Sequence, residues 1–389
     1  MKKSFWSFGF AALIGVSLAG YIIADNKTGY VETDLVVNKL VNGVPTLTDA
    51  NGTVHVAKFF DPHLVNPWGV GESAASPFWI SDNGAGISTL YNTVGSPQAL
   101  VVSIPVAGQP LGSAGTPTGV VFNTAGGALG GFKISGVTAG GLPTSQPAVF
   151  LFATEDGTIL GWNPMVNPIG FDPTKAGTYA IVAARPPGAI YKGLAIAIDS
   201  GGTARLYATN FHAGTVDVFD TSFNLQTPAA FIDTSLPRGY APFNVVLVGG
   251  KLFVTYAVQD ADAKDDVAGM SHGIVDTFDL AGQSPRRFAQ HGQLNSPWGV
   301  AVAPANFGAL AGSVWIGNFG NGQINAYDSS TGTFVDKVRN PHGQAIVIDG
   351  LWSLKVGNGG NGGLADTIYF TAGPNDEEDG LFGALSPQQ

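Results

Sequence analysis

Six copies of one short sequence pattern recur along the chain, and this repetition constrains the fold more than any other feature. Each copy has a turn and an apolar segment, then a second apolar segment, a polar corner and an alternating third segment. The clearest copies contain NPWGV at 66–70 and SPWGV at 296–300. The six first segments are PWGV at 67, PTGVVF at 117, KGLAIAI at 192, FNVVLV at 243, PWGVAV at 297 and LWSLKV at 351.

A glycine opens the third segment of each copy, and the spacing of these glycines identifies the type of repeat. Successive members lie 49 to 71 residues apart: Gly86, Gly157, Gly214, Gly273, Gly322 and Gly380. Spacing this irregular excludes a tight solenoid but suits propeller blades, which tolerate insertions between strands. Alternating runs such as residues 215–219 indicate strands of period two. The sequence therefore predicts an all-β fold, a six-bladed β-propeller.

An alternating segment at residues 33–40 belongs to no copy, whereas the sixth copy has no fourth strand. Addition of this N-terminal strand to the last blade would remove an exposed sheet edge. We therefore expect residues 33–389 to form one propeller that the N-terminal strand closes. Trp68 and Trp298 are expected to begin the inner strands of blades one and five and to pack between neighbouring sheets.

Composition agrees with many short strands and limits the classes of partner. The chain has 55 glycines, 24 prolines and only 12% charged residues, which is typical of strands joined by tight turns. Its formal net charge is −10, and no basic cluster follows the first three residues, so nucleic acid is not expected as a partner. The absence of cysteine excludes disulfides and thiolate catalysis.

Residues 1–24 have the pattern of a secretory signal peptide or an uncleaved N-terminal anchor. Lys2 and Lys3 precede an apolar run, and the sequence Ser-Leu-Ala at 17–19 provides a small-x-small cleavage motif. Residues 25–32 would then be a linker. We expect an exported protein, periplasmic, secreted or at the cell surface, with membrane contact only if the segment is not cleaved.

Two stretches resemble a known family: HLVNPWGVGESAASPFWISDNGAGISTLYN and GNGGNGGLADTIYFTAGPNDEEDGLFGAL. They resemble exported bacterial β-propeller proteins of unassigned function, which are NHL-like, and the resemblance covers roughly residues 33–385. Some members carry a C-terminal PEP-CTERM sorting tail, but this sequence ends in LSPQQ and lacks that pattern. The resemblance implies a fold and export, and it implies no activity.

The corners between the second and third strands are expected to share one face with the loops that precede the inner strands. This face surrounds the channel and is the predicted binding face. Its candidate residues are Asp82, Asn83, Asp156, Asn210, Phe211, His212, Asn318, Phe319 and Asn375. The two phenylalanines occupy matching corners of blades three and five, where they would either stack on a sugar or cover the channel mouth.

Three histidines precede the inner strands of consecutive blades and are candidate metal ligands: His63, His291 and His342. Asp376 and Glu377 extend this set, and oxygen-rich corners suit Ca2+ or another divalent cation. A metal-activated water would use Glu377, Asp376 or His212 as a general base. The alternative explanation is that these histidines cap turns and that the carboxylates are solvated.

Two functions remain open from the sequence. One is an exported binding module that recognises an extracellular protein, a glycan or a small molecule through its channel face. The alternative is a metal-dependent hydrolase of the lactonase or esterase type, with a divalent cation at the channel mouth. Neither a Gly-x-Ser-x-Gly nor a His-Glu-x-x-His motif occurs in the sequence, so no complete catalytic set supports the hydrolase.

Overall fold

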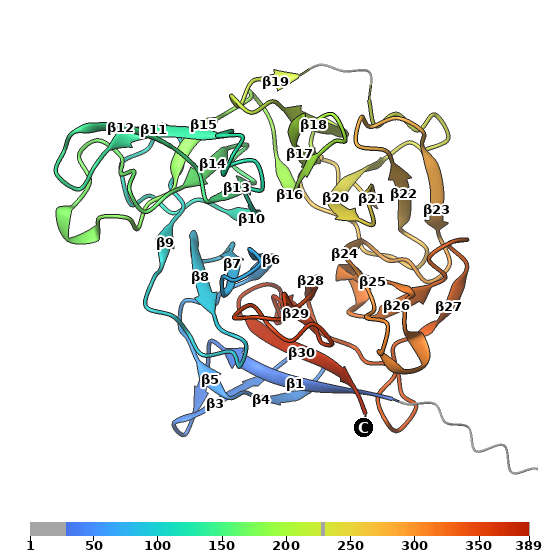
Figure 1. The fold of residues 1–389 in the computed structure, drawn as a ribbon. Helices are drawn as coiled ribbons and strands as arrows, with labels where there is room; N and C mark the ends of the chain where they lie inside the picture. The colour runs from blue at the N-terminus through green and yellow to red at the C-terminus, as the bar shows by residue number, and fades with distance from the viewer. Residues whose placement is uncertain (1–28, 227–229, 389) are drawn as a thin grey trace, which may run out of the picture.

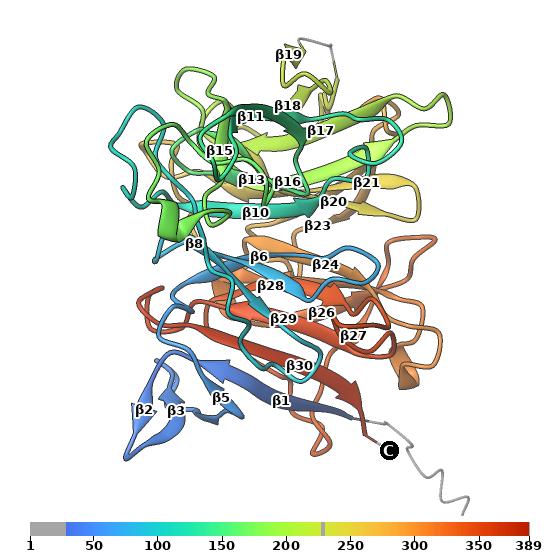
Figure 2. The ribbon, with the colours of Figure 1, turned by 60° about the vertical axis from the view of Figure 1, so that its left-hand side comes forward.

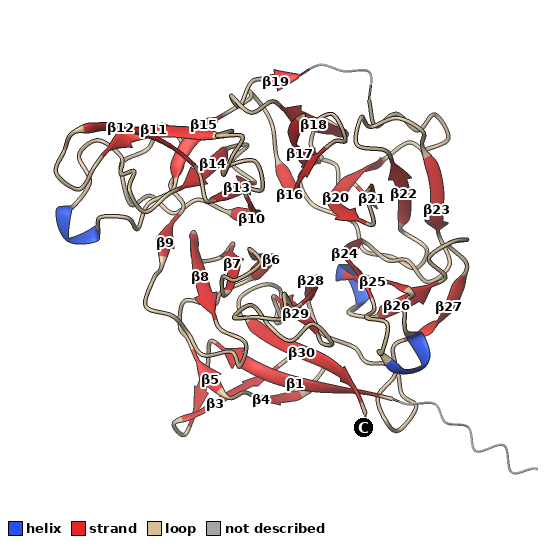
Figure 3. Cartoon of the chain, viewed as in Figure 1, coloured by secondary structure: helices blue, strands red, loops and turns tan. Residues whose placement is uncertain are grey.

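The structure, a computed structural model, describes residues 29–226 and 230–388, and the regular secondary structure of these residues is almost entirely β-strand (Figure 3). Over these residues there is no α-helix, and the three 3-10 helices are η1 (Pro173–Lys175), η2 (Gly308–Leu310) and η3 (Phe319–Asn321). None of these described helices has the length and apolar character needed to cross a membrane. The predicted signal segment, residues 1–24, lies outside the described residues.

The described residues form eight small sheets, and six of them contain four or five strands. These six larger sheets are arranged around a common centre, in a β-propeller-like fold (Figure 1). In five of them the first strand is innermost and the following strands lie outward in chain order. In the sixth, three C-terminal strands have this order and two N-terminal strands are added at the outer edge. The six inner strands carry the six apolar segments that the sequence repeat predicts.

The first three larger sheets follow one another along the chain. The first contains β6 (Pro67–Gly71), β7 (Phe78–Asp82), β8 (Ile87–Tyr91) and β9 (Val102–Ser103). The second contains β10 (Pro117–Phe122), β13 (Phe150–Thr154), β14 (Ile159–Trp162) and β15 (Ile181–Ala184). The third contains β16 (Tyr191–Ile198), β17 (Ala204–Asn210), β18 (Thr215–Phe219) and β19 (Leu225–Gln226).

The other three larger sheets complete the circuit. The fourth contains β20 (Tyr240–Val248), β21 (Lys251–Val258), β22 (Ile274–Phe278) and β23 (Arg286–Gln290). The fifth contains β24 (Pro297–Val302), β25 (Val314–Asn318), β26 (Ile324–Tyr327) and β27 (Phe334–Lys337). The last contains β28 (Leu351–Val356), β29 (Ile368–Ala372), β30 (Leu381–Pro387), β1 (Tyr30–Val37) and β5 (Phe59–Phe60).

Two smaller sheets are insertions that the repeat does not predict. One consists of β2 (Leu40–Val41), β3 (Val44–Thr48) and β4 (Val54–Val56). The other pairs β11 (Lys133–Val137) with β12 (Pro143–Pro147). Figure 2 shows the first of these insertions beside β1, at the edge of the last larger sheet.

Each inner strand has a register irregularity at the same position of the repeat, and a small residue or asparagine lies within it or directly after it. These residues are Gly69, Gly119, Gly193, Asn244, Gly299 and Ser353. A Cβ atom on Gly69 would lie 2.5 Å from the carbonyl oxygen of Thr118, and one on Gly299 would lie 2.7 Å from that of Trp352. The glycine of the repeated Pro-Trp-Gly motif is therefore required because the neighbouring inner strand passes directly against it.

The N-terminal strand pairs with the C-terminal strand, as the sequence predicts. β1 runs antiparallel to β30, with Val31 opposite Ser386 and Val37 opposite Leu381 (Figure 1). The strand begins at Tyr30 rather than residue 33 and ends at Val37 rather than residue 40. It ends there because β30 begins at Leu381, so the ladder has no partner beyond Val37.

Burial of one face of β1 should make this closure a major contributor to stability. Leu35 is 3% exposed and packs in a buried cluster with Phe78 and Tyr91, whereas Leu40 on β2 is 47% exposed. We expect Leu35→Ala to lower the free energy of unfolding in urea by about 2–5 kcal/mol, through lost burial and the cavity left behind. Leu40→Ala is the matched control and should change it by less than about 0.5 kcal/mol. Equal effects of the two changes would contradict this account of closure.

Candidate functional site in the central channel

One residue of each inner strand, within the register irregularity, occupies an equivalent position of the repeat. The six residues are Trp68, Thr118, Lys192, Phe243, Trp298 and Trp352. Trp68 stacks on Trp352 with ring centroids 3.6 Å apart, and Trp298 meets Trp352 edge-on at 5.7 Å. The sequence predicts that the two tryptophans of the repeated motif pack between neighbouring sheets. Instead they meet in the channel, where the register irregularity of their strands places their side chains.

This set of aromatic residues, together with Phe211 and Phe319 from two corners, forms what we call the aromatic plug. Beyond the plug, the second halves of the six inner strands line a cavity of about 480 Å3. Its wall is mostly apolar, and Glu72 and Lys355 supply its charges, with Glu72 Oε1 3.6 Å from Lys355 Nζ. Burial raises the pKa of Glu72 to about 7, against the opposing effect of Lys355. The plug therefore separates this cavity from the loops at the other end of the channel.

Lys192 is the charged member of the inner-strand set, and its side chain is 2% exposed. Its ammonium lies 2.5 Å from Glu155 Oε1 and 3.0 Å from Asp265 Oδ1. It also lies over two rings of the plug, 5.2 Å from the centroid of Trp68 and 5.9 Å from that of Phe211. Burial alone would lower the pKa of Lys192, but the charges and hydrogen bonds of Glu155 and Asp265 raise it above its ordinary value.

Corners from four larger sheets meet around this ammonium and form what we call the mouth cluster. Its members are Asn83, Glu155, Lys192, Asp265 and Glu377. Asn83 Nδ2 donates a hydrogen bond of 2.9 Å to Glu155 Oε2. Three carboxyl groups thus accompany one ammonium, so the cluster carries excess negative charge when all three are ionised.

Glu377 is the member of the mouth cluster with an unused hydrogen-bonding atom. Its Oε1 is buried and has no hydrogen-bond partner among the described residues. Burial and the charge of Glu155 raise the pKa of Glu377 to about 7, while Lys192 and a hydrogen bond from Asn66 oppose that rise. Its backbone is left-handed, as are those of Asn375 and Asp376, with φ of 68°, 60° and 52°. A left-handed conformation costs a residue other than glycine about 1–2 kcal/mol. Such local strain is concentrated at functional sites.

Several predicted binding-face residues lie beneath the surface and are engaged in turns. These are Asp82, Asn210, Phe211 and Asn318, which are 0 to 6% exposed. Asp82 Oδ2 accepts hydrogen bonds from both Thr89 N and Thr89 Oγ1, and Asn318 Nδ2 donates to the carbonyl of Gln293. Phe211 is fully buried in the plug and so cannot stack on a sugar. These corners use their polar side chains to hold the hairpins, because backbone groups at a turn need partners.

The remaining binding-face residues lie nearer the surface. Asn83 joins the mouth cluster, and Phe319 is half-buried with its ring stacked 4.0 Å above Trp352. His212 is exposed, with Nδ1 3.3 Å from the carbonyl oxygen of Ala263 in the β21–β22 loop. Asp156 accepts a hydrogen bond from Thr116 N, and Asn375 donates one to Asp379.

The structure does not bring the three predicted metal-ligand histidines together at one site. His63 pairs with Asp61 at 3.0 Å, His291 lies against the carbonyl of Ser271, and the backbone N–H of His342 donates to Asn340 Oδ1. Asp376 is exposed, and Glu377 belongs to the mouth cluster. Across residues 29–226 and 230–388, a single group of three potential metal ligands occurs, Glu32, Asp34 and His55, and it lies on other elements.

Sequence reasoning missed the central member of the cluster. Lys192 was visible as the first residue of KGLAIAI, at the position that tryptophan holds in the first, fifth and sixth copies. A lysine at an apolar position of a repeat was the available signal. Glu155 and Asp265 were visible as corner carboxylates, but nothing in the sequence indicates that both reach the same ammonium.

Comparison with known proteins gives two long matches to viral proteins. The chain is 32% identical to the uncharacterised protein R648 of Acanthamoeba polyphaga mimivirus over 336 residues, which is 85% of this chain and 76% of R648. It is also 32% identical to the uncharacterised protein L690 of the same virus over 346 residues, 86% of this chain and 83% of L690. These relatives give no support to the bacterial origin that the sequence resemblance implies. No family model matches the chain.

Solved structures with similar folds have low sequence identity. A streptogramin B lyase structure aligns with a TM-score of 0.48 and 12% identity, over 92% of this chain and 97% of that one. The PQQ-bound aldose sugar dehydrogenase from Streptomyces coelicolor aligns with a TM-score of 0.47 and 13% identity, over 84% and 95%. Similarity at this level says nothing about activity.

Removal of the buried ammonium should destabilise the protein in a pH-dependent way. We expect Lys192→Met to lower the free energy of unfolding at pH 8 by about 3 kcal/mol, because Glu155 is left as a buried, unpaired charge. The loss should shrink towards acidic pH, where carboxylates are protonated and need no ionic partner. Lys264→Met, at a side chain 56% exposed and 3.7 Å from Asp265, is the control and should have little effect. A loss that does not vary with pH would contradict the assignment.

Glu377 should make the protein less stable as pH rises. Its folded pKa of about 7 exceeds its unfolded value of 4.5, so the folded state binds the proton more tightly and loses stability between these values. Because glutamine mimics the protonated form, Glu377→Gln should be more stable than wild type at pH 8, by about 1–3 kcal/mol. The two proteins should converge near pH 4 in urea unfolding. Glu378→Gln, one residue along and exposed, controls for the loss of one negative charge from the loop.

Proposed function

This chain belongs to the same family as the mimivirus proteins R648 and L690, and because both relatives are uncharacterised we propose its function from the residues of the channel. It is an exported, six-bladed β-propeller in which each larger sheet is one blade. It acts as a binding module whose mouth cluster takes a small ligand that bears a protonated amine. The observation that carries this proposal is the excess of carboxylates at the mouth, with one buried Glu377 oxygen left without a partner.

Charge and shape both support an amine as the recognised group. An alkylammonium is a compact cation with three hydrogen-bond donors, and a buried carboxylate without a donor is costly. An ammonium at the mouth would supply a donor to Glu377 and compensate its charge. Phe319, half-buried on the plug, offers an aromatic face for the same cation. Of the ligand classes that the sequence leaves open, these features favour a small molecule.

The alternative, a metal-dependent hydrolase with Ca2+ or another divalent cation at the mouth, has less support. The ammonium of Lys192 already lies between Glu155 and Asp265, so a divalent cation bound to the same oxygens would be repelled by a neighbouring positive charge. Only Glu377 and the surrounding corner oxygens would remain for it. The arrangement of charges therefore favours binding over hydrolysis.

A matched pair of ligands tests the proposal. Isothermal titration calorimetry at pH 8 should show binding of 1,5-diaminopentane and none of 1,5-pentanediol, which has the same length without the charge. Glu377→Gln should weaken binding at least about tenfold, a typical loss when a charged hydrogen-bond partner is removed. Glu378→Gln should bind as wild type does. Failure of the diamine to bind, or equal binding by the Glu377→Gln variant, would sink the proposal.

A further inference from the structure

A second group of ionisable side chains lies away from the channel, where the N-terminal strand meets the small insertion sheet. Glu32 and Asp34 are two residues apart on β1, so their side chains share one face of that strand. His55 is the buried residue of β4, whose two neighbours are exposed. Asp49 follows β3, and its Oδ1 accepts a hydrogen bond from Thr53 N. Neither β3 nor β4 belongs to the sequence repeat, so the repeat does not account for this group.

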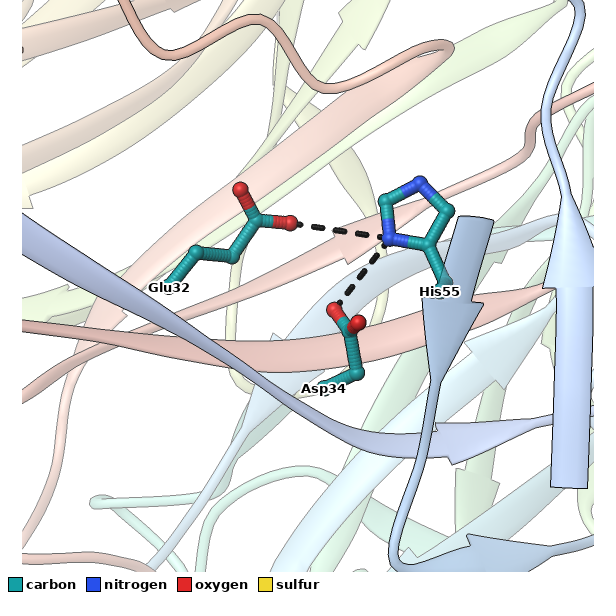
Figure 4. A group of neighbouring side chains, drawn as sticks. All are labelled: Glu32, Asp34 and His55. Carbon is teal, nitrogen blue, oxygen red and sulfur yellow. Dashed lines mark hydrogen bonds and ion pairs between the residues drawn. The ribbon is translucent and has the colours of Figure 1, made fainter. Parts of the chain in front are cut away.

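Both β1 carboxylates point at the same nitrogen of the imidazole (Figure 4). His55 Nδ1 lies 3.3 Å from Asp34 Oδ1 and 3.7 Å from Glu32 Oε1. A tetrahedral zinc ion with bonds of about 2.0–2.1 Å holds neighbouring ligand atoms about 3.3 Å apart. The observed separations therefore match ligand atoms around one metal ion after a small movement of Glu32.

The other ring nitrogen faces a third carboxylate. His55 Nε2 lies 3.7 Å from Asp49 Oδ2, on a side chain that is 0% exposed. A metal-binding histidine usually donates its second N–H to a carboxylate, which fixes the tautomer and the ring orientation. Asp49 stands where such an orienting group belongs, with its Oδ1 held by Thr53.

Burial and unsatisfied hydrogen bonding point to an additional ion. His55 is 3% exposed and Asp49 is 5% exposed. Three buried atoms of the group have no hydrogen-bond partner in the part of the chain that the structure describes: Glu32 Oε1, Asp49 Oδ2 and His55 Nε2. Over the described parts of the chain, no lysine or arginine forms an ion pair with these carboxylates, whose recorded ion-pair partner is His55 itself. Three carboxylates around one imidazole leave buried negative charge that a divalent cation would neutralise.

We infer that Glu32, Asp34 and His55 bind Zn2+, with Asp49 positioning the histidine. The mixed nitrogen and oxygen ligand set suits zinc, whereas calcium takes oxygen ligands alone. Three protein ligands leave one position for water or another ligand. The ion would join the closing strand β1 to the insertion sheet, so its binding would stabilise the closure. This site shares no residue with the mouth cluster and does not depend on the proposed amine binding.

The inference is tested on the full chain without an affinity tag. Zinc titration against a chromogenic chelator, with elemental analysis after dialysis, should give one tightly bound Zn2+ per chain. Zinc should also raise the thermal midpoint, because an ion that binds only the folded state stabilises it. Co2+ in its place should give the visible absorption of a tetrahedral site. Absence of stoichiometric zinc in the wild-type protein would overturn the inference, and would mean that the carboxylates hold His55 as an imidazolium.

Variants distinguish this site from adventitious binding. His55→Gln, and the double change Glu32→Gln with Asp34→Asn, should abolish the stoichiometric zinc and the Co2+ spectrum. Asp49→Asn should keep one zinc per chain but bind it about 10- to 100-fold more weakly, as expected for an orienting residue. His63→Gln is the control, because His63 also pairs with an aspartate, 3.0 Å away, but is 55% exposed. Equal zinc binding by His55→Gln, or loss of zinc in the His63→Gln control, would contradict the assignment.

Discussion

The close passage of neighbouring inner strands past one another is the constraint on which the rest of the structure depends. At one position of every inner strand the residue is small or an asparagine, and the register shifts at or directly before it. The residue that precedes it lies within the shift and turns its side chain into the channel, where tryptophans from distant parts of the chain meet. One backbone requirement thus produces the aromatic plug, and the plug divides the channel into a loop-bearing mouth and an apolar cavity.

The residue at the inward-facing position of the third inner strand, Lys192, sets the chemistry of the mouth. Where three of the other copies have tryptophan, the third has Lys192, and a buried ammonium needs negative partners. Glu155 and Asp265 provide them, and Glu377 then lies in a region already rich in carboxylates, which contributes to its raised pKa. Glu72 has a similarly raised pKa for a simpler reason, burial at the wall of the cavity. Both divisions of the channel therefore contain a carboxyl group whose protonation is sensitive to pH near neutrality.

The repeat in the sequence was sufficient to predict the inner strands, the corner positions and the pairing of β1 with β30, because each of these follows from local periodicity or from an unpaired edge. It could not predict how side chains from different copies combine. Lys192 and Asp265 are 73 residues apart, and their contact depends on the path of one long loop. The zinc ligands were missed because His55 lies in an insertion that no copy of the repeat resembles. The three histidines that the sequence grouped precede consecutive inner strands, yet each is held by its own loop.

The pairing of Tyr30 with Pro387 also fixes the direction in which the chain enters the fold. The corner before β30 lies at the mouth, so the far end of β30, and with it the start of β1, lies at the opposite face. A tether attached ahead of Tyr30 would thus leave from the side away from the mouth cluster.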